Sequence, residues 1–384
     1  MAALSSGHLA TDLAQGALPA LLPFLVVKFD LSYTMAAALV LAATVSSSLI
    51  QPAFGVWSDV RGALWLLPAG VALAGVGMAL AAVAPTYPLV MLAVLAAGVG
   101  VAAYHPEGSK FASYVSGERR ASGMAFFSVG GNLGFALGPV LASGVVIALG
   151  LTGGLLIALP GLIVAAALLA VRPYLENFAP TAATVRAQVR GGGRPGGLVL
   201  LLCVVGLRSV AHMGLFTFVP LYEVARGRSE AYGTVLLSLF LLMGAIGTLF
   251  GGQLADRVGR RAVLLGSFVV STPLILLYAL SAGVVGQIAL VLSGAAVIGT
   301  FGVSLVLSQE YMPGRVGLAS GLSIGLAIGL GGVAALTLGA VADAVDLETA
   351  VAATAVGPAI AFVVTLLLPP APRRRQAEPA PVTI

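Results

Sequence analysis

The chain has 384 residues, of which 59% are hydrophobic and only 9% are charged, and its formal net charge is +5. Soluble domains carry about 25% charged residues, so this composition excludes a water-soluble fold of ordinary surface polarity. The basic residues fall between long apolar runs, which also excludes a nucleic-acid-binding face.

Twelve apolar runs follow one another along the chain. A spanning helix needs about 20 predominantly apolar residues to cross a hydrocarbon core roughly 30 Å thick. The first run continues without a signal-peptide cleavage site, so we expect it to be the first span. The sequence thus predicts an all-α polytopic membrane protein with spans near 5–27, 33–57, 64–84, 88–113, 121–149, 152–171, 198–222, 232–254, 262–281, 284–311, 317–341 and 349–368.

The longest polar interruption lies between the sixth and seventh runs and contains the flexible string GGGRPGG. Two pseudo-symmetric six-helix halves, each built of three-helix units, form a known transporter plan. We therefore expect an N-terminal bundle over 1–172, a cytoplasmic linker over 173–197, a C-terminal bundle over 198–369 and a cytoplasmic tail over 370–384.

Basic residues indicate the orientation, because cytoplasmic loops of membrane proteins are enriched in Lys and Arg. With the N-terminus inside, 15 of the 19 basic residues fall in inside loops or the tail, and only Lys28, Arg226 and Arg228 fall outside. We expect a monomer in contact with lipid in a bacterial inner membrane, with both termini in the cytoplasm.

One loop motif occurs at equivalent points of the two halves. GVWSDVRG follows the second span and contains Gly55 and Asp59, which lies 197 residues before its counterpart in GQLADRVGRR. The second copy contributes Gly252, Asp256, Arg257, Gly259, Arg260 and Arg261. The two leading glycines predict close helix contact. Each aspartate is expected to cap a neighbouring helix N-terminus, where negative charge is favoured, and to pair with the basic turn.

These features resemble the major facilitator superfamily over essentially the whole chain. The second loop motif is close to that family's signature, and Gly134, Gly138 and Pro139 in the fifth span match a pattern associated with proton-driven antiporters. The chain departs from the family at Val94, where a basic residue is usual. The resemblance implies that the loop motif holds the cytoplasmic side shut in one state of alternating access.

At finer grain, the chain resembles the fosmidomycin-resistance branch of that superfamily. The resemblance implies drug efflux coupled to proton influx, with a phosphonate antibiotic as the namesake substrate. The strings that carry it are GHLATDLAQGALPALLPF, AAYHPEGSK, FFSVGGNLGFALGP, LRSVAHMGLFTFVPLY and SQEYMPGRVGLASG.

Ionisable residues inside the spans point to one central cavity. A charged side chain in hydrocarbon costs several kcal/mol and normally faces a cavity or a partner. Equivalent helices of the three-helix units can line one cavity. The embedded ionisable residues occupy the first, fourth, seventh and tenth spans and are His8, Asp12, His105, Glu107, Arg208, His212 and Glu310.

The first span is expected to carry the proton. His8, Asp12 and Gln15 are spaced i, i+4 and i+7, so they share one helix face. Asp12 lies about 12 Å deep at 1.5 Å per residue. We interpret Asp12 as the proton carrier, assisted by His8, His105 and Glu107. The alternative is a neutral Asp12 that only holds helices together through His8.

Arg208, near the midplane of the seventh span, predicts an anionic partner. Arg does not lose its proton in proteins, and its planar fork suits phosphonate or carboxylate oxygens. One interpretation is that solute and an internal carboxylate compete for Arg208, and the other is a static ion pair with Asp12 or Glu107. The expected substrate-binding set is Arg208, His212, Gln15, Tyr104 and Asn132.

The fourth and tenth spans leave further alternatives open. Pro106 is expected to kink the fourth span beside His105, because it removes a backbone donor. Glu107 is either part of the proton path or a carboxylate that is solvated or paired with Lys110. Glu310 is either a gate or ion-pair residue or a solvated helix end.

Three functions compete as explanations of this sequence. The favoured one is a proton-coupled exporter of a small solute, with no cofactor or metal, and a symporter or facilitator for an anionic metabolite is the alternative. A third is a membrane-embedded metalloenzyme that uses His8, His105, His212 and Asp12 as zinc ligands. The sequence has no H-E-x-x-H spacing, which disfavours the enzyme.

Overall fold

The computed structural model describes residues 1–384 except 62, 117–119, 179–193, 282, 313–315 and 370–384. The side chains of 56, 58–61, 113, 120–122, 124, 125, 316–318, 320, 321 and 324 also lie outside the described part. Within the described part, twelve segments are long and apolar enough to cross a membrane. Helices form here because hydrocarbon offers no partner to backbone N–H and C=O groups, which must bond within the segment.

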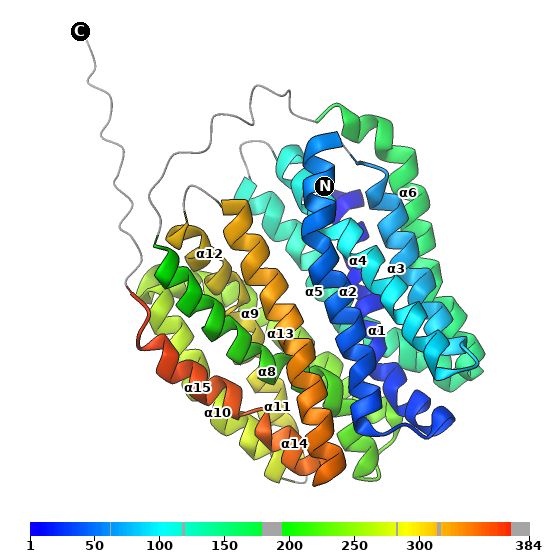
Figure 1. Cartoon of the computed structure of the whole chain (residues 1–384), viewed down its shortest axis with the longest axis vertical. Coiled ribbons are helices and arrows are strands. Elements are labelled where there is room, and N and C mark those ends of the chain that lie inside the picture. Colours follow the sequence, from blue (N-terminus) through cyan, green and yellow to red (C-terminus); the bar gives the residue numbers. More distant parts are fainter. Residues whose placement is uncertain (62, 117–119, 179–193, 282, 313–315, 370–384) are drawn as a thin grey trace.

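The helices fall into an N-terminal and a C-terminal group that lie side by side (Figure 1). The first group consists of α1 (Ala2–Phe29), α2 (Tyr33–Arg61), α3 (Leu66–Val83), α4 (Tyr87–Val115), α5 (Arg120–Leu149), the 3₁₀ segment η2 (Leu151–Ile157) and α6 (Ala158–Glu176). The second consists of α8 (Pro195–Ala225), α9 (Glu230–Val258), α10 (Arg260–Leu280), α11 (Val284–Gly299), α12 (Phe301–Tyr311), α13 (Val316–Ala344), α14 (Leu347–Ala353) and α15 (Val356–Thr365).

The twelve predicted spans are confirmed, with helix ends that differ from the predicted ones by a few residues in either direction. Three spans are not the uniform α-helices that the sequence predicts. The sixth begins as the 3₁₀ segment η2, the tenth is interrupted at Thr300, and the twelfth is interrupted between Ala353 and Val356. The interruption at Thr300 bears on the functional site.

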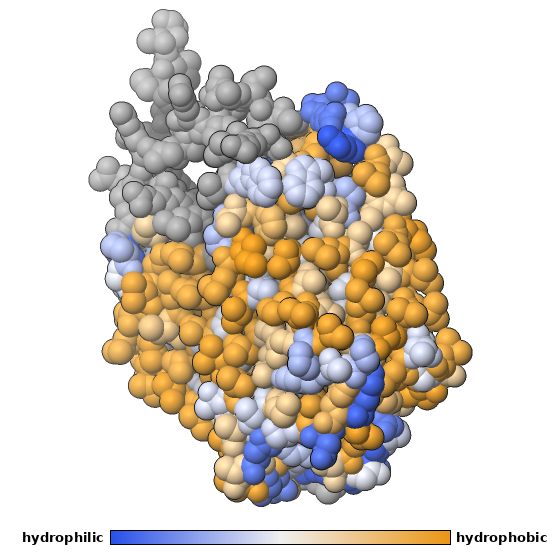
Figure 2. All heavy atoms as spheres, turned by 45° about the vertical axis from the view of Figure 1, so that its right-hand side comes forward, coloured by the Kyte–Doolittle hydropathy of each residue, from blue (hydrophilic) through white to orange (hydrophobic). Residues whose placement is uncertain are grey.

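The surface of the bundle suits lipid as the solvent. Hydrophobic side chains cover a broad middle band, and hydrophilic residues gather at the upper and lower ends of the molecule (Figure 2). Large aliphatic side chains such as Ile163, Leu169 and Val235 are exposed. Exposed apolar patches of this extent on a soluble monomer would be unusual. The chain is an integral membrane protein.

The two ends of the bundle can be told apart by the segments that lie there. We call the end that holds Ala2 of α1 and Thr365 of α15 the termini face. The opposite end, which holds the loops that join α1 to α2 and α13 to α14, is the far face. Because each half contributes an even number of spans, the described start of the chain and the end of α15 lie at the same end.

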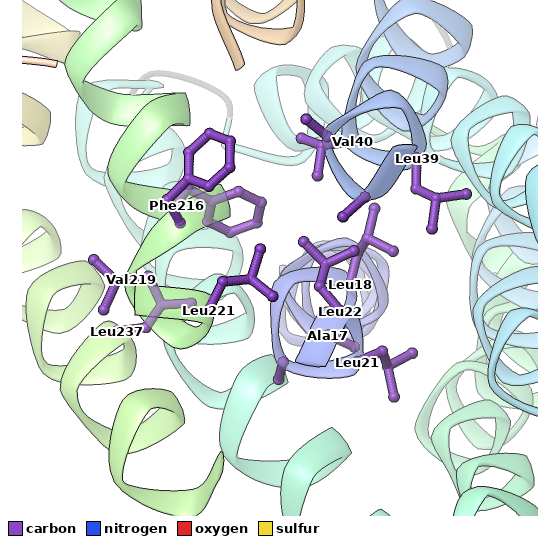
Figure 3. Packing of buried hydrophobic residues seen from close by; sticks show 14 of the residues in the cluster. Ala17, Leu18, Leu21, Leu22, Leu39, Val40, Phe216, Val219, Leu221 and Leu237 are labelled. Atoms are coloured by element: carbon purple, nitrogen blue, oxygen red, sulfur yellow. The ribbon is translucent and has the colours of Figure 1, made fainter. Parts of the chain in front are cut away.

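On the far-face side, one apolar core joins the two halves. Leu18, Leu22 and Leu25 of α1 belong to the same buried cluster as Phe216 and Leu221 of α8. Figure 3 shows Leu18 and Leu22 of α1 approaching Phe216 and Leu221 across the boundary between the halves. Apolar packing of this kind excludes water, so the far-face side of the interface is closed.

On the termini-face side, the described core is divided. One buried cluster, which includes Leu4, Val71 and Phe111, belongs to the N-terminal half alone. Another, which includes Leu201 and Leu307, belongs to the C-terminal half alone. Among the described residues, the two halves thus share one buried apolar core at the far face and have separate cores toward the termini face.

A polar contact between the halves reinforces the far-face closure. The carboxylate of Asp343, near the end of α13, accepts hydrogen bonds from the backbone N–H groups of Tyr33 (2.8 Å) and Thr34 (2.9 Å) at the start of α2. The first N–H groups of a helix have no partner within it, and a carboxylate there is favoured by the helix dipole. Asp343 therefore caps a helix of the opposite half.

Candidate functional site

In the N-terminal half, Asp12 is bracketed by two histidines. Its Oδ2 lies 3.3 Å from Nε2 of His8, one turn earlier on α1, and its Oδ1 lies 2.9 Å from Nε2 of His105 on α4. Asp12 is only 4% exposed. The structure therefore brings together three of the predicted proton-coupling residues, and it turns Asp12 inward and away from lipid.

A backbone carbonyl fixes the proton of the His8 ring. Nδ1 of His8 lies 2.8 Å from the carbonyl oxygen of Phe127 on α5, and the two rings stack at 4.2 Å. A carbonyl can only accept, so Nδ1 is assigned as the protonated nitrogen. In neutral His8, Nε2 then presents a lone pair to Asp12, and the contact with a carboxylate requires one additional proton between them.

Glycines of α5 let this helix lie directly against α1. A methyl group at Gly131 would meet both His8 and Asp12, and one at Gly134 or Gly138 would overlap backbone atoms of α1. Small residues permit such close approach between membrane helices. Gly134 and Gly138 therefore pack closely against the first span, and Pro139 lies within the same helix.

The remaining predicted residues of α4 are engaged with the protein. Glu107 is fully buried, and its Oε2 lies 2.9 Å from Nζ of Lys110, which is the paired arrangement foreseen as an alternative. Pro106 lies inside α4 as predicted. The Tyr104 hydroxyl donates to the Leu4 carbonyl and is fully buried, so the expectation that it donates to a solute does not hold in this structure.

Gln15 and Asn132 are close in sequence to residues that contact or form the His8–Asp12 pair, but their side chains have different surroundings. Gln15 is buried on α1 beside a small gap lined by Ala43 and Gly98. Asn132 is half-buried on α5, next to Gly131. Their substrate contacts remain predictions.

In the C-terminal half, Arg208 on α8 is 3% exposed and is held by hydroxyl groups. Its Nη1 donates to Oγ1 of Thr300 (3.3 Å) and Oγ of Ser304 (3.4 Å), and its Cζ lies 5.6 Å from the ring centre of Phe301. No carboxylate among the described residues lies within 4.0 Å of it. The static ion pair with Asp12 or Glu107 is therefore not observed.

Asp12 and Arg208 occupy comparable places in the two halves. They lie 196 residues apart, close to the 197-residue offset of the loop motif. Asp12 links α1 to α4, and Arg208 links α8 to the segment that joins α11 and α12. Both side chains are buried in their halves, and His212 is half-buried one turn beyond Arg208. The two clusters place an acid and a base on pseudo-equivalent helices.

The expected tight packing at the loop motif is wrong for this structure. A methyl group at Gly252 would meet no atom within 4 Å, and one at Gly55 would make only an ordinary contact with Pro106. Both glycines lie toward the termini face, where the described apolar core is divided between the halves. The side chain of Asp59 lies outside the described residues.

The second copy of the motif is stabilised by its basic turn. Asp256 has a side chain that is 77% exposed and caps no helix in the described part, and its Oδ1 lies 3.9 Å from Nη2 of Arg260. Arg260 instead pairs more closely with Oε1 of Glu310, at 3.1 Å, which realises the ion-pair alternative for that acid. Arg257 is exposed. Gly259 has φ of +94°, a conformation that suits glycine at this sharp turn.

Arg261 completes the turn by binding the end of the last span. It donates from Nε to the Thr365 carbonyl (3.2 Å) and from Nη2 to the Leu366 carbonyl. Cations near a helix C-terminus are favoured by the dipole. The basic residues of this copy thus tie α10 to α12 and α15 within the C-terminal half.

Several partners in these clusters carry little or no signal in the sequence. Thr300 and Ser304 are ordinary hydroxyl residues of an apolar span, although Gly299 and Gly302 around Thr300 hint at a break in the helix. The Phe127 carbonyl has no sequence signal at all, since any residue supplies one. Asp343 follows the predicted end of its span, so its hydrogen bonds to the other half are not expected from hydropathy.

A further buried acid, Glu223, also falls just past a predicted span. It accepts a hydrogen bond of 2.9 Å from the Tyr278 hydroxyl. It lines a cavity of about 180 Å³ at the far face together with Arg226, Arg228 and Gln287. This cavity lies in the C-terminal half alone, apart from the two clusters.

The donors of the N-terminal cluster also have metal-ligand character. One atom each from His8, Asp12 and His105 lie within 4.8 Å of one another. His212 is not part of this group, so the four-ligand set that a metalloenzyme would need is not assembled among the described residues.

Comparison with known proteins decides the family. A family model described as Major Facilitator Superfamily matches residues 4–336 and 231–383. The chain belongs to the major facilitator superfamily. It is a transporter of small molecules and not an enzyme.

Two curated relatives are similar over nearly the whole chain. The uncharacterized MFS-type transporter YfnC of Bacillus subtilis (strain 168) is 30% identical over 380 residues, covering 94% of this chain and 90% of that protein. The fosmidomycin resistance protein of Escherichia coli (strain K12) is 29% identical over 354 residues, covering 91% and 87%. The similarity therefore extends over both halves of each relative.

Solved structures of other transporters share the fold. A bacterial homologue of the human lysosomal transporter Spinster, in an inward-facing and occupied conformation, aligns with a TM-score of 0.78 and 14% identity over 95% of both chains. A mutant of the nucleoside transporter NupG aligns with a TM-score of 0.76 and 13% identity over 95% of this chain and 98% of that one. At this identity the likeness concerns the fold alone.

Proposed function

We propose that this protein is a proton-coupled exporter of a small anionic drug, such as a phosphonate antibiotic, and works by alternating access. In this proposal it acts as a monomer in a bacterial inner membrane with the termini face in the cytoplasm. The excess of basic residues in the loops of that face supports the orientation. The relative described as a fosmidomycin resistance protein supports the substrate class.

The observation that carries the proposal is the hydrogen-bonding requirement of the His8–Asp12 contact. Because the Phe127 carbonyl accepts a hydrogen bond from Nδ1 of His8, that nitrogen carries a proton. The 3.3 Å contact between Nε2 of His8 and Oδ2 of Asp12 is then favourable only when a further proton is bound to Nε2 or to Asp12. When this proton is lost, Nε2 of His8 and Oδ2 of Asp12 are both hydrogen-bond acceptors, and the contact between them weakens. A group of this kind binds and releases a proton with a change in packing between α1, α4 and α5.

Arg208 supplies the solute-binding charge. A buried guanidinium keeps its proton and needs an anion, and no carboxylate of the described chain takes that place.

The division of the core toward the termini face supports loading from the cytoplasm. In the proposed cycle, solute moves outward after the Asp12 cluster has released its proton, and the reloaded cluster returns without solute. Gln15, Asn132 and His212 are proposed secondary contacts.

Symport of an anionic metabolite is the second candidate, and one observation favours it. An anion at Arg208 would attract a proton held in the opposite half, because opposite charges in a medium of low dielectric constant attract strongly. This attraction would therefore favour binding of the proton and the anion at the same time. Export requires instead that the conformational change links the release of the proton to the binding of the solute.

Transport into everted membrane vesicles separates the two candidates. An exporter should accumulate fosmidomycin in everted vesicles only when the vesicle lumen is acid, because protons then leave as the drug enters. A proton symporter should accumulate it when the external medium is acid. Uptake that is the same under both gradients would contradict proton coupling altogether.

A further inference from the structure

The tenth span is broken beside Arg208, which creates a helix N-terminus near the middle of the membrane. α11 ends at Gly299 and α12 begins at Phe301, with Thr300 between them at φ −89° and ψ 3°. The first N–H groups of a helix have no carbonyl partner within that helix. The C-terminus of α11 lies one residue away, so its partial negative charge offsets the partial positive charge at the start of α12.

Arg208 binds at this break in the tenth span. Its guanidinium donates to Thr300, the residue before α12, and to Ser304 in the first turn, and it lies over the ring of Phe301. Arg208 is removed from bulk water, and a guanidinium keeps its charge when buried. A buried cation without a carboxylate partner indicates that the missing component of the site is an anion.

Several hydrogen-bond donors of this site have no acceptor in the described chain. Both bonds of Arg208 leave from Nη1, so its Nε and Nη2 edge has no partner among the described residues. Thr300 is buried and accepts from Arg208, but its own hydroxyl proton has no acceptor there. The Ser304 hydroxyl differs, because it donates to the Phe301 carbonyl at 2.8 Å. Thr300 can thus donate to a ligand, whereas Ser304 positions Arg208.

We propose that the head group of the transported solute is a tetrahedral oxyanion bound between Arg208 and the first turn of α12, with Thr300 as a specificity-determining residue. This inference rests on the proposed function for the identity of the site as the transport site. The free edge of Arg208 can engage two oxygens side by side, and the Thr300 hydroxyl can donate to a third. A phosphonate has three such oxygens, and a carboxylate has only two.

Binding of two acids that differ only in the head group tests the site. Phenylphosphonate and benzoate are titrated calorimetrically into the purified full-length protein. We expect phenylphosphonate to bind at least about tenfold more tightly, since a hydrogen bond to a charged group commonly accounts for that factor. Thr300→Val, which keeps the shape and removes the hydroxyl, should weaken phenylphosphonate by about tenfold. Thr300→Ser should restore binding to within about twofold of wild type.

Ser308→Ala is the matched control. Ser308 is a fully buried serine one turn further along α12, and its hydroxyl donates to Leu305. This variant should bind as wild type does. Absent or equal binding of the two acids by wild-type protein would overturn the inference, and so would Thr300→Val binding phenylphosphonate like wild type.

Vesicle transport run in parallel separates this inference from the proposed function. If proton-driven fosmidomycin uptake fails while phenylphosphonate binding still depends on Thr300, the oxyanion site stands and the export proposal falls. If uptake is proton-driven but binding is indifferent to Thr300→Val, the exporter stands and the site assignment falls.

Discussion

Adding one methyl group at Gly131 is expected to uncouple transport without removing any titratable group. An alanine Cβ there would lie 2.5 Å from Nε2 of His8 and 2.6 Å from Oδ2 of Asp12, whereas ordinary contacts begin at 3.4 Å. The imidazole must therefore move by about 0.9 Å. Nε2 and Oδ2 are already 3.3 Å apart, near the upper limit for a hydrogen bond, so we expect this displacement to break their contact.

The size of the effect follows from the bond that is lost. A hydrogen bond to a charged group contributes about 1.5–3 kcal/mol, and about 1.4 kcal/mol corresponds to a tenfold change in an equilibrium. The balance between the proton-loaded and proton-free cluster should shift by at least about tenfold. Proton-driven export should fall by a similar factor, while binding at Arg208 in the other half stays within about twofold.

Fosmidomycin uptake into acid-lumen everted vesicles measures the export rate, and calorimetry on purified protein measures binding. Gly144→Ala is the control, because Gly144 lies on the same helix and a methyl group there meets no atom within 4 Å. Alanine is also the better helix former, by about 1 kcal/mol, so α5 itself should not be weakened. Wild-type export by Gly131→Ala, with wild-type expression and unfolding temperature, would refute the reasoning.

Three further substitutions address separate parts of the account. Asp12→Asn should abolish proton-driven uptake in vesicles, because the amide cannot carry the proton, and it should leave fosmidomycin binding within about twofold of wild type. Arg208→Ala should weaken binding of fosmidomycin by at least about tenfold in calorimetry, the effect of losing charge-assisted hydrogen bonds. Asp343→Asn should loosen the cap on Tyr33 and Thr34 by about 1 kcal/mol, and hydrogen exchange of the first turn of α2 should rise about fivefold by mass spectrometry.

Each of these has an opposing result. Proton-driven uptake by Asp12→Asn at the wild-type rate would remove Asp12 from the proton path. Wild-type affinity in Arg208→Ala would place the solute elsewhere. Unchanged exchange in Asp343→Asn would mean that apolar packing alone closes the far face.

The twelve spans could be predicted because the bilayer fixes the length of an apolar run, and run length is a property of the sequence alone. The inward orientation of the ionisable residues in the first and fourth spans could be predicted for a similar reason, although the ionisable residues of the four spans do not form one group. Burial of an ionisable residue in hydrocarbon demands a partner, so His8, Asp12 and His105 had to face inward. Their contacts at 3.3 Å and 2.9 Å fulfil that expectation.

The partners of Arg208 could not be predicted, because Thr300 and Ser304 lie 92 and 96 residues away and hydroxyl residues are common in membrane helices. The same applies to Asp343, which contacts α2 across 310 positions. Such contacts depend on how each helix is rotated and broken, which apolar composition does not encode. The error at Gly252 has another origin, since the sequence allows close packing at a glycine but does not fix which conformation brings a neighbour there, and in this structure a methyl group would meet no atom within 4 Å.

The central claim is that Asp12 exchanges a proton for a solute held at Arg208, and proton movement during transport tests it most directly. Proteoliposomes containing the purified protein and the pH dye pyranine, with equal pH on both sides, are given external fosmidomycin. The account predicts that the lumen becomes alkaline as the drug enters, and that Asp12→Asn gives no pH change although it still binds the drug. A lumen that becomes acid, or an unchanged pH during measurable uptake by the wild type, would contradict the account.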